Sequence, residues 1–273
     1  MKNDGQGFRP VDTDALGVKR VLAEIDTTVA HPARVYDYVL GGKDNWPADR
    51  EVAERSIVLM PNVREEALAN RAFLRRAVRY AASRGITQFL DIGTGIPTVG
   101  PTHEVAHSVR PDARIIYVDN DPVVLAHARA LLVDDDLTYV IQADVRDPGS
   151  ILNHPETRRR LDFTEPIALM FVGLFYFIAE DALDGLVERY SQALAPGSHL
   201  LLTHAIDTPE VNAMKEVYKA TAPLVPRSRA RITELFEGWD LVEPGLVPVH
   251  EWHPDEDDSP QAGHLLGGVA VKH

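Results

Sequence analysis

The segment FLDIGTGIP, residues 89–97, combines residue types that are suited to holding a nucleotide-like ligand. An apolar run ends at Asp91, and Gly93 and Gly95 flank Thr94 just before a helix-like segment. Glycine lets the backbone turn tightly and approach a ligand where a Cβ atom would obstruct it. This order of residues is typical of a nucleotide-binding turn that follows a strand.

Two further acidic residues follow apolar runs later in the chain, at Asp119 in RIIYVDND and at Asp144 in YVIQADV. Nucleoside sites place a carboxylate against ribose hydroxyls roughly 20 residues after the glycine turn. We therefore expect three strand ends to converge on one ligand. The candidate ligand-binding residues are Asp91, Gly93, Thr94, Gly95, Asp119, Asn120, Asp144 and Val145.

A competing metal motif follows the glycine turn. His103, Glu104 and His107 match H-E-x-x-H, in which two imidazoles one helical turn apart bind zinc and the Glu acts as general base. The motif opens the helix directly after the turn, however, and no third ligand follows at a familiar spacing. We therefore favour a site without metal over a zinc hydrolase. His103 and Glu104 are expected to face the cofactor or substrate, and His107 is expected to be an ordinary helix residue.

Composition excludes several classes of protein. The 273 residues include no cysteine and carry a formal net charge of −13. This charge argues against sequence-independent binding to nucleic acid, and the Arg-rich stretches at 71–79 and 158–160 are interpreted as solvated helix faces. The lack of cysteine excludes disulfides and fits a reducing compartment. With no long apolar run and no secretory signal, the chain is expected to be cytoplasmic and without membrane contact.

From residue 87 onward, the apolar pattern predicts alternating strands and helices. Such alternation is typical of βαβ units around a parallel sheet, and a chain of this length suits one main core. In chain order, the expected strands and helices cover residues 88–92, 102–109, 114–119, 122–132, 138–143, 167–172, 182–194 and 199–203.

The last third of the chain departs from this alternation. Residues 241–249 and 265–271 are strand-like, and an acidic turn-rich stretch joins them without room for a helix. A β-hairpin is expected, which gives the sheet an antiparallel edge. This topology and the turn, which has Pro97 and no third glycine at the required place, disfavour a nicotinamide-dependent oxidoreductase.

Two parts are expected before the first strand. Residues 1–30 lack periodicity and are expected to form a flexible arm, whereas residues 31–85 form a helical lid over the core at 86–273. The alternative is that Tyr36 and Tyr38 are half-buried helix residues and that Lys43 is a solvated loop charge. The candidate substrate and lid residues are Arg34, Tyr38, Lys43, Asn45, Asn70 and Arg71.

Taken together, these motifs resemble the class I S-adenosylmethionine-dependent methyltransferases, which have a Rossmann-like α/β core with a mostly parallel seven-stranded sheet and an antiparallel edge hairpin. More narrowly, HPARVYDYVLGGKDNW, DIGTGIPT and IIYVDNDPVVLAHARALL are similar to an actinobacterial S-adenosyl methyltransferase family whose substrates are largely unassigned. The resemblance covers nearly the whole chain from His31. One departure is Pro101, which stands where that family is expected to have Asn.

The resemblance implies S-adenosyl-L-methionine as the cofactor and a role for each strand end. Asp91 and the glycine turn would hold the methionine part, and Asp119 would accept hydrogen bonds from the ribose hydroxyls. Asp144 and the Val145 backbone would meet the adenine. Carboxylates accept from hydroxyl and amino donors and favour a ligand with sulfonium and ammonium charges, whereas they would repel a pyrophosphate.

The reaction implied is in-line methyl transfer to an oxygen or nitrogen of a small molecule, which depends chiefly on alignment of the nucleophile. An acceptor that must lose a proton needs a base, for which His103, His204 and Tyr176 are candidates. A structural role is the alternative for His204 and Tyr176. The alternative to an active enzyme is a non-catalytic regulatory protein that binds S-adenosylmethionine. The acceptor and the oligomeric state cannot be read from the sequence.

Overall fold

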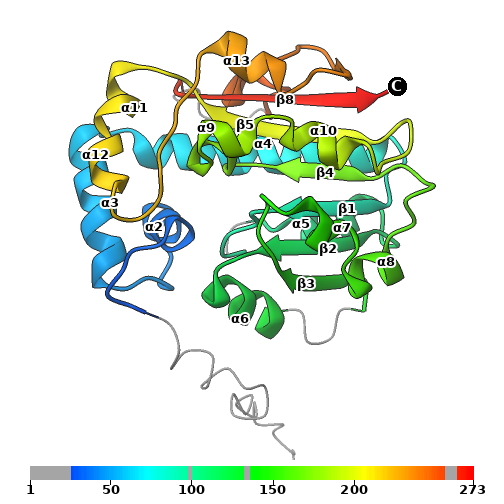
Figure 1. Ribbon diagram of the computed structural model, residues 1–273, viewed down its shortest axis with the longest axis horizontal. Coiled ribbons are helices and arrows are strands. Elements are labelled where there is room, and N and C mark those ends of the chain that lie inside the picture. The colour runs from blue at the N-terminus through cyan, green and yellow to red at the C-terminus, as the bar shows by residue number, and fades with distance from the viewer. Residues whose placement is uncertain (1–25, 98–99, 132–135, 256–262) are drawn as a thin grey trace, which may run out of the picture.

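The computed structural model describes residues 26–97, 100–131, 136–255 and 263–273, which form a three-layer α/β structure around an eight-stranded sheet (Figure 1). The order along the sheet is β3-β2-β1-β4-β5-β8-β6, and β7 pairs with β8 beside this path. The strands are β1 Gln88–Ile92, β2 Arg114–Asp119, β3 Thr138–Gln142, β4 Ala168–Phe171, β5 His199–Ala205, β6 Trp239–Leu241, β7 Val247–Pro248 and β8 Leu265–Lys272.

The first five strands are parallel, and β8 runs antiparallel to β5 and β6. Every residue of β1, β4 and β5 is buried, as expected for strands covered by helices on both faces. The predicted mostly parallel sheet with an antiparallel edge is confirmed. Most of the predicted arm, residues 1–25, lies outside the described residues.

Two expected elements are divided in the structure. The strand expected at 241–249 is split into β6 and β7 by a turn in which the Gly245 amide donates to the Val242 carbonyl at 2.8 Å. Pro244 lacks an N–H group and Gly245 has a φ of 89°, so neither fits a strand interior. The helix expected at 182–194 is divided at Gly185, which has a φ of 64°.

Helices cover both faces of the sheet. On one face α4 (Val63–Ser83), α5 (Thr102–Val109) and α6 (Pro122–Leu131) pack on a cluster that includes Phe89, Ile115 and Tyr117. The opposite cluster holds apolar residues of α7 (Pro148–Leu152), α9 (Glu180–Leu183), α10 (Leu186–Ser191) and α13 (Arg229–Glu234), and α8 (Pro155–Arg160) follows α7. Within the described ranges, no helix combines the length and apolar composition needed to cross a bilayer.

Four helices gather beyond the carboxyl ends of the parallel strands, at the left of Figure 1. They are α2 (Pro32–Val39), α3 (Pro47–Leu59), α11 (Pro209–Ala213) and α12 (Lys215–Tyr218). The range expected to form a lid thus has two roles, because α2 and α3 lie at the strand ends while α4 packs on the sheet face. The sequence pattern did not predict α3.

Two arginines of α4 are buried, so the interpretation of residues 71–79 as a solvated face is wrong for Arg71 and Arg76. The Arg76 guanidinium donates to the Trp252 carbonyl at 2.7 Å and to the Val249 carbonyl at 2.6 Å. Val249 belongs to a short 3-10 helix, η2 (Val249–Glu251), that packs against α4. Arg76 therefore satisfies carbonyls that a purely apolar helix face would leave unpaired.

Arg76→Met is expected to lower the free energy of unfolding by about 3 kcal/mol, because two buried carbonyls lose a charged donor. Arg79→Met is the matched control on the same helix, since Arg79 is 48% exposed and pairs with Asp255 at the surface. The control should change the free energy by less than about 1 kcal/mol. Urea unfolding followed by circular dichroism measures both, and equally small effects would contradict a structural role for the Arg76 hydrogen bonds.

Candidate functional site

A cleft of about 360 Å³ lies at the carboxyl ends of the parallel strands. Its walls come from the loops after β1, β2, β3 and β4, from the start of α2, from α4 and from residues 221–223. Its volume is within the range of pockets that enclose small organic ligands. The sequence-predicted residues that line it are Gly93, Thr94, Gly95, Asp119, Asn120, Asp144, Val145, Asn70 and Arg71.

The glycine turn follows β1 and forms the floor of the cleft. Gly93 has a φ of 73°, and a Cβ atom added there would lie 2.6 Å from Leu174 Cδ1. Gly95 has a φ of 63°, and a Cβ atom there would meet nothing within 4 Å. Gly93 is thus required by close packing, whereas Gly95 presents bare backbone to open space.

Asp119, at the end of β2, is buried against this turn. One carboxyl oxygen accepts a hydrogen bond from the Gly95 amide, and the other accepts one from the Asp121 amide, both at 2.9 Å. Burial raises the pKa of Asp119, and these two hydrogen bonds oppose the increase. The carboxylate thereby fixes the shape of the turn while it borders the cleft.

Asp91 lies beneath the turn and is not among the residues that line the cleft. Its carboxylate accepts a hydrogen bond from the Thr102 hydroxyl, in the first turn of α5, at 2.7 Å. Burial raises the pKa of Asp91 to about 6, although the Thr102 hydrogen bond and the Arg71 charge oppose it. Asp91 therefore ties the end of β1 to α5.

Asp144, after β3, lies at the outer wall of the cleft beside Arg146. The Arg146 guanidinium donates to its carboxylate at 2.9 Å, and this hydrogen bond lowers the pKa of Asp144. The next residue, Val145, is buried, and its carbonyl accepts a hydrogen bond from the Tyr190 hydroxyl at 2.8 Å. The loop after β3 is thus anchored to α10.

Asn70 and Arg71 reach the cleft from α4, which lies on the sheet face. Asn70 is 2% exposed and donates through Nδ2 to the Tyr36 hydroxyl at 3.2 Å. Its Oδ1 atom has no hydrogen-bond partner among the described residues. Arg71 donates to the Gly100 carbonyl at 3.3 Å, near the start of α5.

The structure does not bring the other four lid candidates into the cleft. Arg34 is buried, with Nε 3.4 Å from a carboxyl oxygen of Asp121, and Lys43 is exposed. The Tyr38 hydroxyl donates to the carboxylate of Glu54 in α3. Asn45 shapes its own loop, in which its Nδ2 atom donates to Asp37 at 2.9 Å.

Different residues of the same segment line the cleft, namely His31, Pro32, Ala33 and Tyr36. Pro32 and Tyr36 are four positions apart, so they lie on one face of α2. Helical periodicity predicts which residues share a face, but it does not say which face meets the sheet edge. In the structure, the Tyr36 hydroxyl donates to the Ala67 carbonyl of α4 at 3.0 Å, a contact between residues 31 positions apart.

Of the three candidate bases, His204 is fully buried at the end of β5. Its Nδ1 atom lies 2.8 Å from the Ala205 carbonyl, and the Arg227 guanidinium donates to its Nε2 atom at 2.9 Å. Burial lowers the pKa of His204 to about 4. Both ring nitrogens are therefore occupied within the fold, away from the cleft.

His103 is also held by a partner, with its Nδ1 atom 2.9 Å from the Tyr117 hydroxyl, and it does not line the cleft. The second histidine of the H-E-x-x-H pattern, His107, has its Nε2 atom 2.9 Å from the Ala113 carbonyl. Across the described part of the chain, no group of three His, Asp or Glu side chains is arranged to hold a metal ion.

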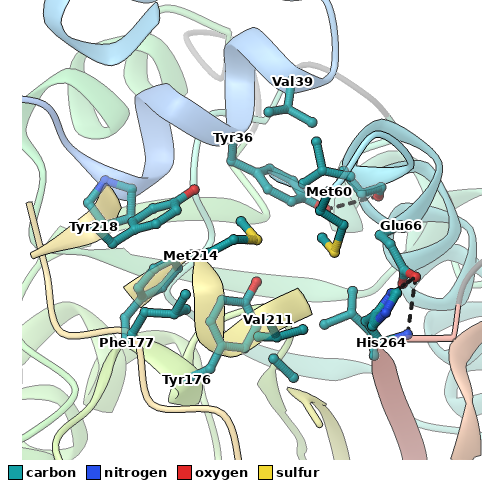
Figure 2. Close-up of a pocket in the computed structure, with 16 residues that line it drawn as sticks. Tyr36, Val39, Met60, Glu66, Tyr176, Phe177, Val211, Met214, Tyr218 and His264 are labelled. Carbon is teal, nitrogen blue, oxygen red and sulfur yellow. Dashed lines mark hydrogen bonds and ion pairs between the residues drawn. The ribbon is translucent and has the colours of Figure 1, made fainter. Parts of the chain in front are cut away.

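Tyr176, the third candidate, lies in η1 (Phe175–Phe177) and borders a second, mostly apolar pocket of about 80 Å³. Burial raises the pKa of Tyr176 well above its ordinary value, so its hydroxyl stays protonated. The two spaces adjoin, because Pro32, Tyr36 and Phe177 line both of them. Figure 2 shows this apolar pocket enclosed by side chains from both ends of the chain.

This strand order, with a glycine turn after β1 and carboxylates after β2 and β3, defines a class I S-adenosylmethionine-dependent methyltransferase fold. The chain belongs to the S-adenosyl methyltransferase family, whose sequence profile matches residues 19–273. The cofactor of this family is S-adenosyl-L-methionine. Both the predicted family and the predicted cofactor are therefore confirmed.

Two solved structures are similar over most of the chain. A protein from Thermobifida fusca YX, described as a methyltransferase, is 44% identical, covers 90% of this chain and 96% of its own, and has a TM-score of 0.87. A DUF574 family protein from Streptomyces avermitilis MA-4680 is 41% identical to this chain and has a TM-score of 0.87. The match covers 91% of this chain and 99% of the Streptomyces protein. No curated protein is similar enough to extend this comparison.

The raised pKa of Asp91 predicts a pH-dependent stability. The folded chain holds this proton more tightly than the unfolded chain, so the contribution of Asp91 to the free energy of unfolding falls as pH rises from about 4 to about 6. Asp91→Asn is therefore expected to stabilise the protein at pH 7.5 by about 2 kcal/mol.

Urea unfolding at pH 7.5 and pH 4.5 measures this effect, and the advantage of Asp91→Asn should shrink at the lower pH. Asp112→Asn is the control, because the Asp112 side chain is 64% exposed. A variant at Asp91 that is less stable than the wild type at pH 7.5 would overturn the assignment of a destabilising buried charge.

Proposed function

We propose that the chain is an active methyltransferase that transfers the methyl group of S-adenosyl-L-methionine to an oxygen or nitrogen of a small molecule. The observation that carries this proposal is the junction of a polar cleft with a separate apolar pocket at Pro32, Tyr36 and Phe177. A protein that only bound the cofactor would not need a second enclosed space beside it.

The residues of the cleft fit the parts of the cofactor. Asp119 has the acceptor oxygens that ribose hydroxyls require, and Asp144 with the Val145 backbone would meet the adenine. The open space at Gly95 and the unpaired Oδ1 of Asn70 suit the methionine part, whose ammonium group is a donor. Asp91 would act from beneath, by tying the turn to α5, whereas Arg71 lines the cleft from α4 and would border the bound cofactor.

When bound, the cofactor supplies an electrophilic methyl group on a sulfonium. The chain contributes by holding an acceptor at the junction of the two spaces, where distance and alignment decide the rate of in-line transfer. Phe177 and Tyr36 border this junction with apolar ring surface. Because Tyr176 stays protonated, we propose that it orients an acceptor by donating a hydrogen bond and is not the base.

We further propose that the acceptor is not a nucleic acid and that the protein acts in the cytoplasm. Asp and Glu outnumber Lys and Arg by 41 to 28, which opposes binding to a polyphosphate backbone. The absence of cysteine is consistent with a reducing compartment.

The test is transfer of label from S-adenosyl-[methyl-³H]methionine into the small-molecule fraction of an actinobacterial cell extract. We expect labelled product to form with the wild-type protein and to be lost with Asp119→Asn. Tight binding of S-adenosylhomocysteine without any transfer, across extracts from several growth phases, would instead indicate a non-catalytic regulatory protein.

Asp119→Asn is expected to weaken the binding of S-adenosylhomocysteine at least about tenfold. Both carboxyl oxygens accept from backbone amides, and an amide side chain can supply only one acceptor for those two donors. Isothermal titration calorimetry measures the change, with the exposed Asp112→Asn as the control. An unchanged affinity would remove Asp119 from the proposed cofactor site.

A further inference from the structure

The apolar pocket contains a buried carboxyl group that no other part of the proposed site uses. Glu66 lies on α4 and is 3% exposed. Its Oε1 atom accepts hydrogen bonds from the Gly263 amide at 2.8 Å and the His264 amide at 3.1 Å, and it lies 2.8 Å from His264 Nδ1. Its Oε2 atom is buried without a hydrogen-bond partner among the described residues.

A buried carboxyl oxygen without a partner is costly, because it has lost its water and gained nothing in return. The contacts to Oε1 hold the side chain in place, so Glu66 cannot easily turn away to reach solvent. Glu66 lines the pocket, and a ligand there can therefore supply the missing donor.

The other walls of this pocket favour a flat apolar ligand. They include the rings of Tyr36, Tyr176, Phe177 and Tyr218, and aromatic faces pack well on another ring and attract a cation. Met60 and Met214 add flexible thioethers, which adapt to irregular ligands. Figure 2 shows these side chains around the space, with Glu66 and His264 together at one side of it.

We infer that the methyl acceptor is a ring-containing, largely apolar molecule with an amine group that donates a hydrogen bond to Glu66 Oε2. This inference rests on the proposed function and specifies its substrate class. Glu66 lines the apolar pocket but not the cleft, so the recognised amine is distinct from the atom that receives the methyl group. The methylated atom lies instead at the junction near Phe177.

Three probes of similar size separate the contributions of the ring and the donor. Phenethylamine, 2-phenylethanol and ethylbenzene share one ring and a two-carbon chain and differ in the terminal group. With the wild-type protein saturated by S-adenosylhomocysteine, ligand-observed NMR titration is expected to show phenethylamine binding about tenfold more tightly than either analogue. Equal binding of the three probes would overturn the inference.

Glu66→Gln is expected to remove this preference while ethylbenzene binding stays the same, since the amide lacks the charge and turns a donor toward the pocket or loses the Gly263 contact. Glu65→Gln is the matched control, because Glu65 is exposed on the same helix. A preference for phenethylamine that survives in Glu66→Gln would overturn the role of Glu66.

Two readouts keep the conclusions separate. If S-adenosylhomocysteine itself does not bind the wild-type protein, the proposed function fails. If S-adenosylhomocysteine binds but the protein shows no preference for phenethylamine over the other two probes, only the inference about the acceptor fails. Should Glu66→Gln not fold, as circular dichroism would show, the comparison of the three probes on the wild-type protein still decides.

Discussion

Burial of two carboxylates at the ends of neighbouring parallel strands is the constraint on which the site depends. Asp91 and Asp119 lie within the fold, where an ionised group must be compensated by hydrogen bonds. The compensating donors are the Gly95 amide and the Thr102 hydroxyl, which belong to the glycine turn and to α5. The strand ends, the turn and the helix are therefore one hydrogen-bonded unit, and the floor of the cleft is shaped before any ligand arrives.

The segment before β1 forms the part of the cleft wall that the loops at the sheet edge leave open. Helix α2 brings Pro32 and Tyr36 to the junction of the polar cleft and the apolar pocket, while Arg34 anchors the same helix to Asp121 beside the cleft. Burial acts to raise the pKa of Asp121, but the contacts with His31, the Val123 amide and Arg34 together hold it below its ordinary value. Helix α2 is thus attached to the core through charged contacts at the same sheet edge that borders the cleft.

The strands and the polar cleft at their carboxyl ends were predictable because their signals are local. β1, β2 and α5 have the predicted bounds, since continuous apolar runs and acidic ends mark them directly. Contacts between distant residues were not predictable. Tyr36, which lines both spaces, donates its hydroxyl to the Ala67 carbonyl of α4 at 3.0 Å, and the His204 ring accepts from Arg227, which comes 23 residues later. The residues that line the apolar pocket come from α2, α4, η1, α11, α12 and β8, so no single stretch of sequence predicts this pocket.

Helix α4 borders both spaces, since Asn70 and Arg71 line the cleft and Glu66 lines the apolar pocket. Because protein interiors are close-packed, a shift of α4 to admit a bulkier compound into the apolar pocket would also change the shape of the cleft. Met214 and Tyr218 line the apolar pocket from outside α4, at the N-cap and at the end of α12. Substitution at these two positions can therefore reshape the pocket while Asn70 and Arg71 keep their places in the cleft.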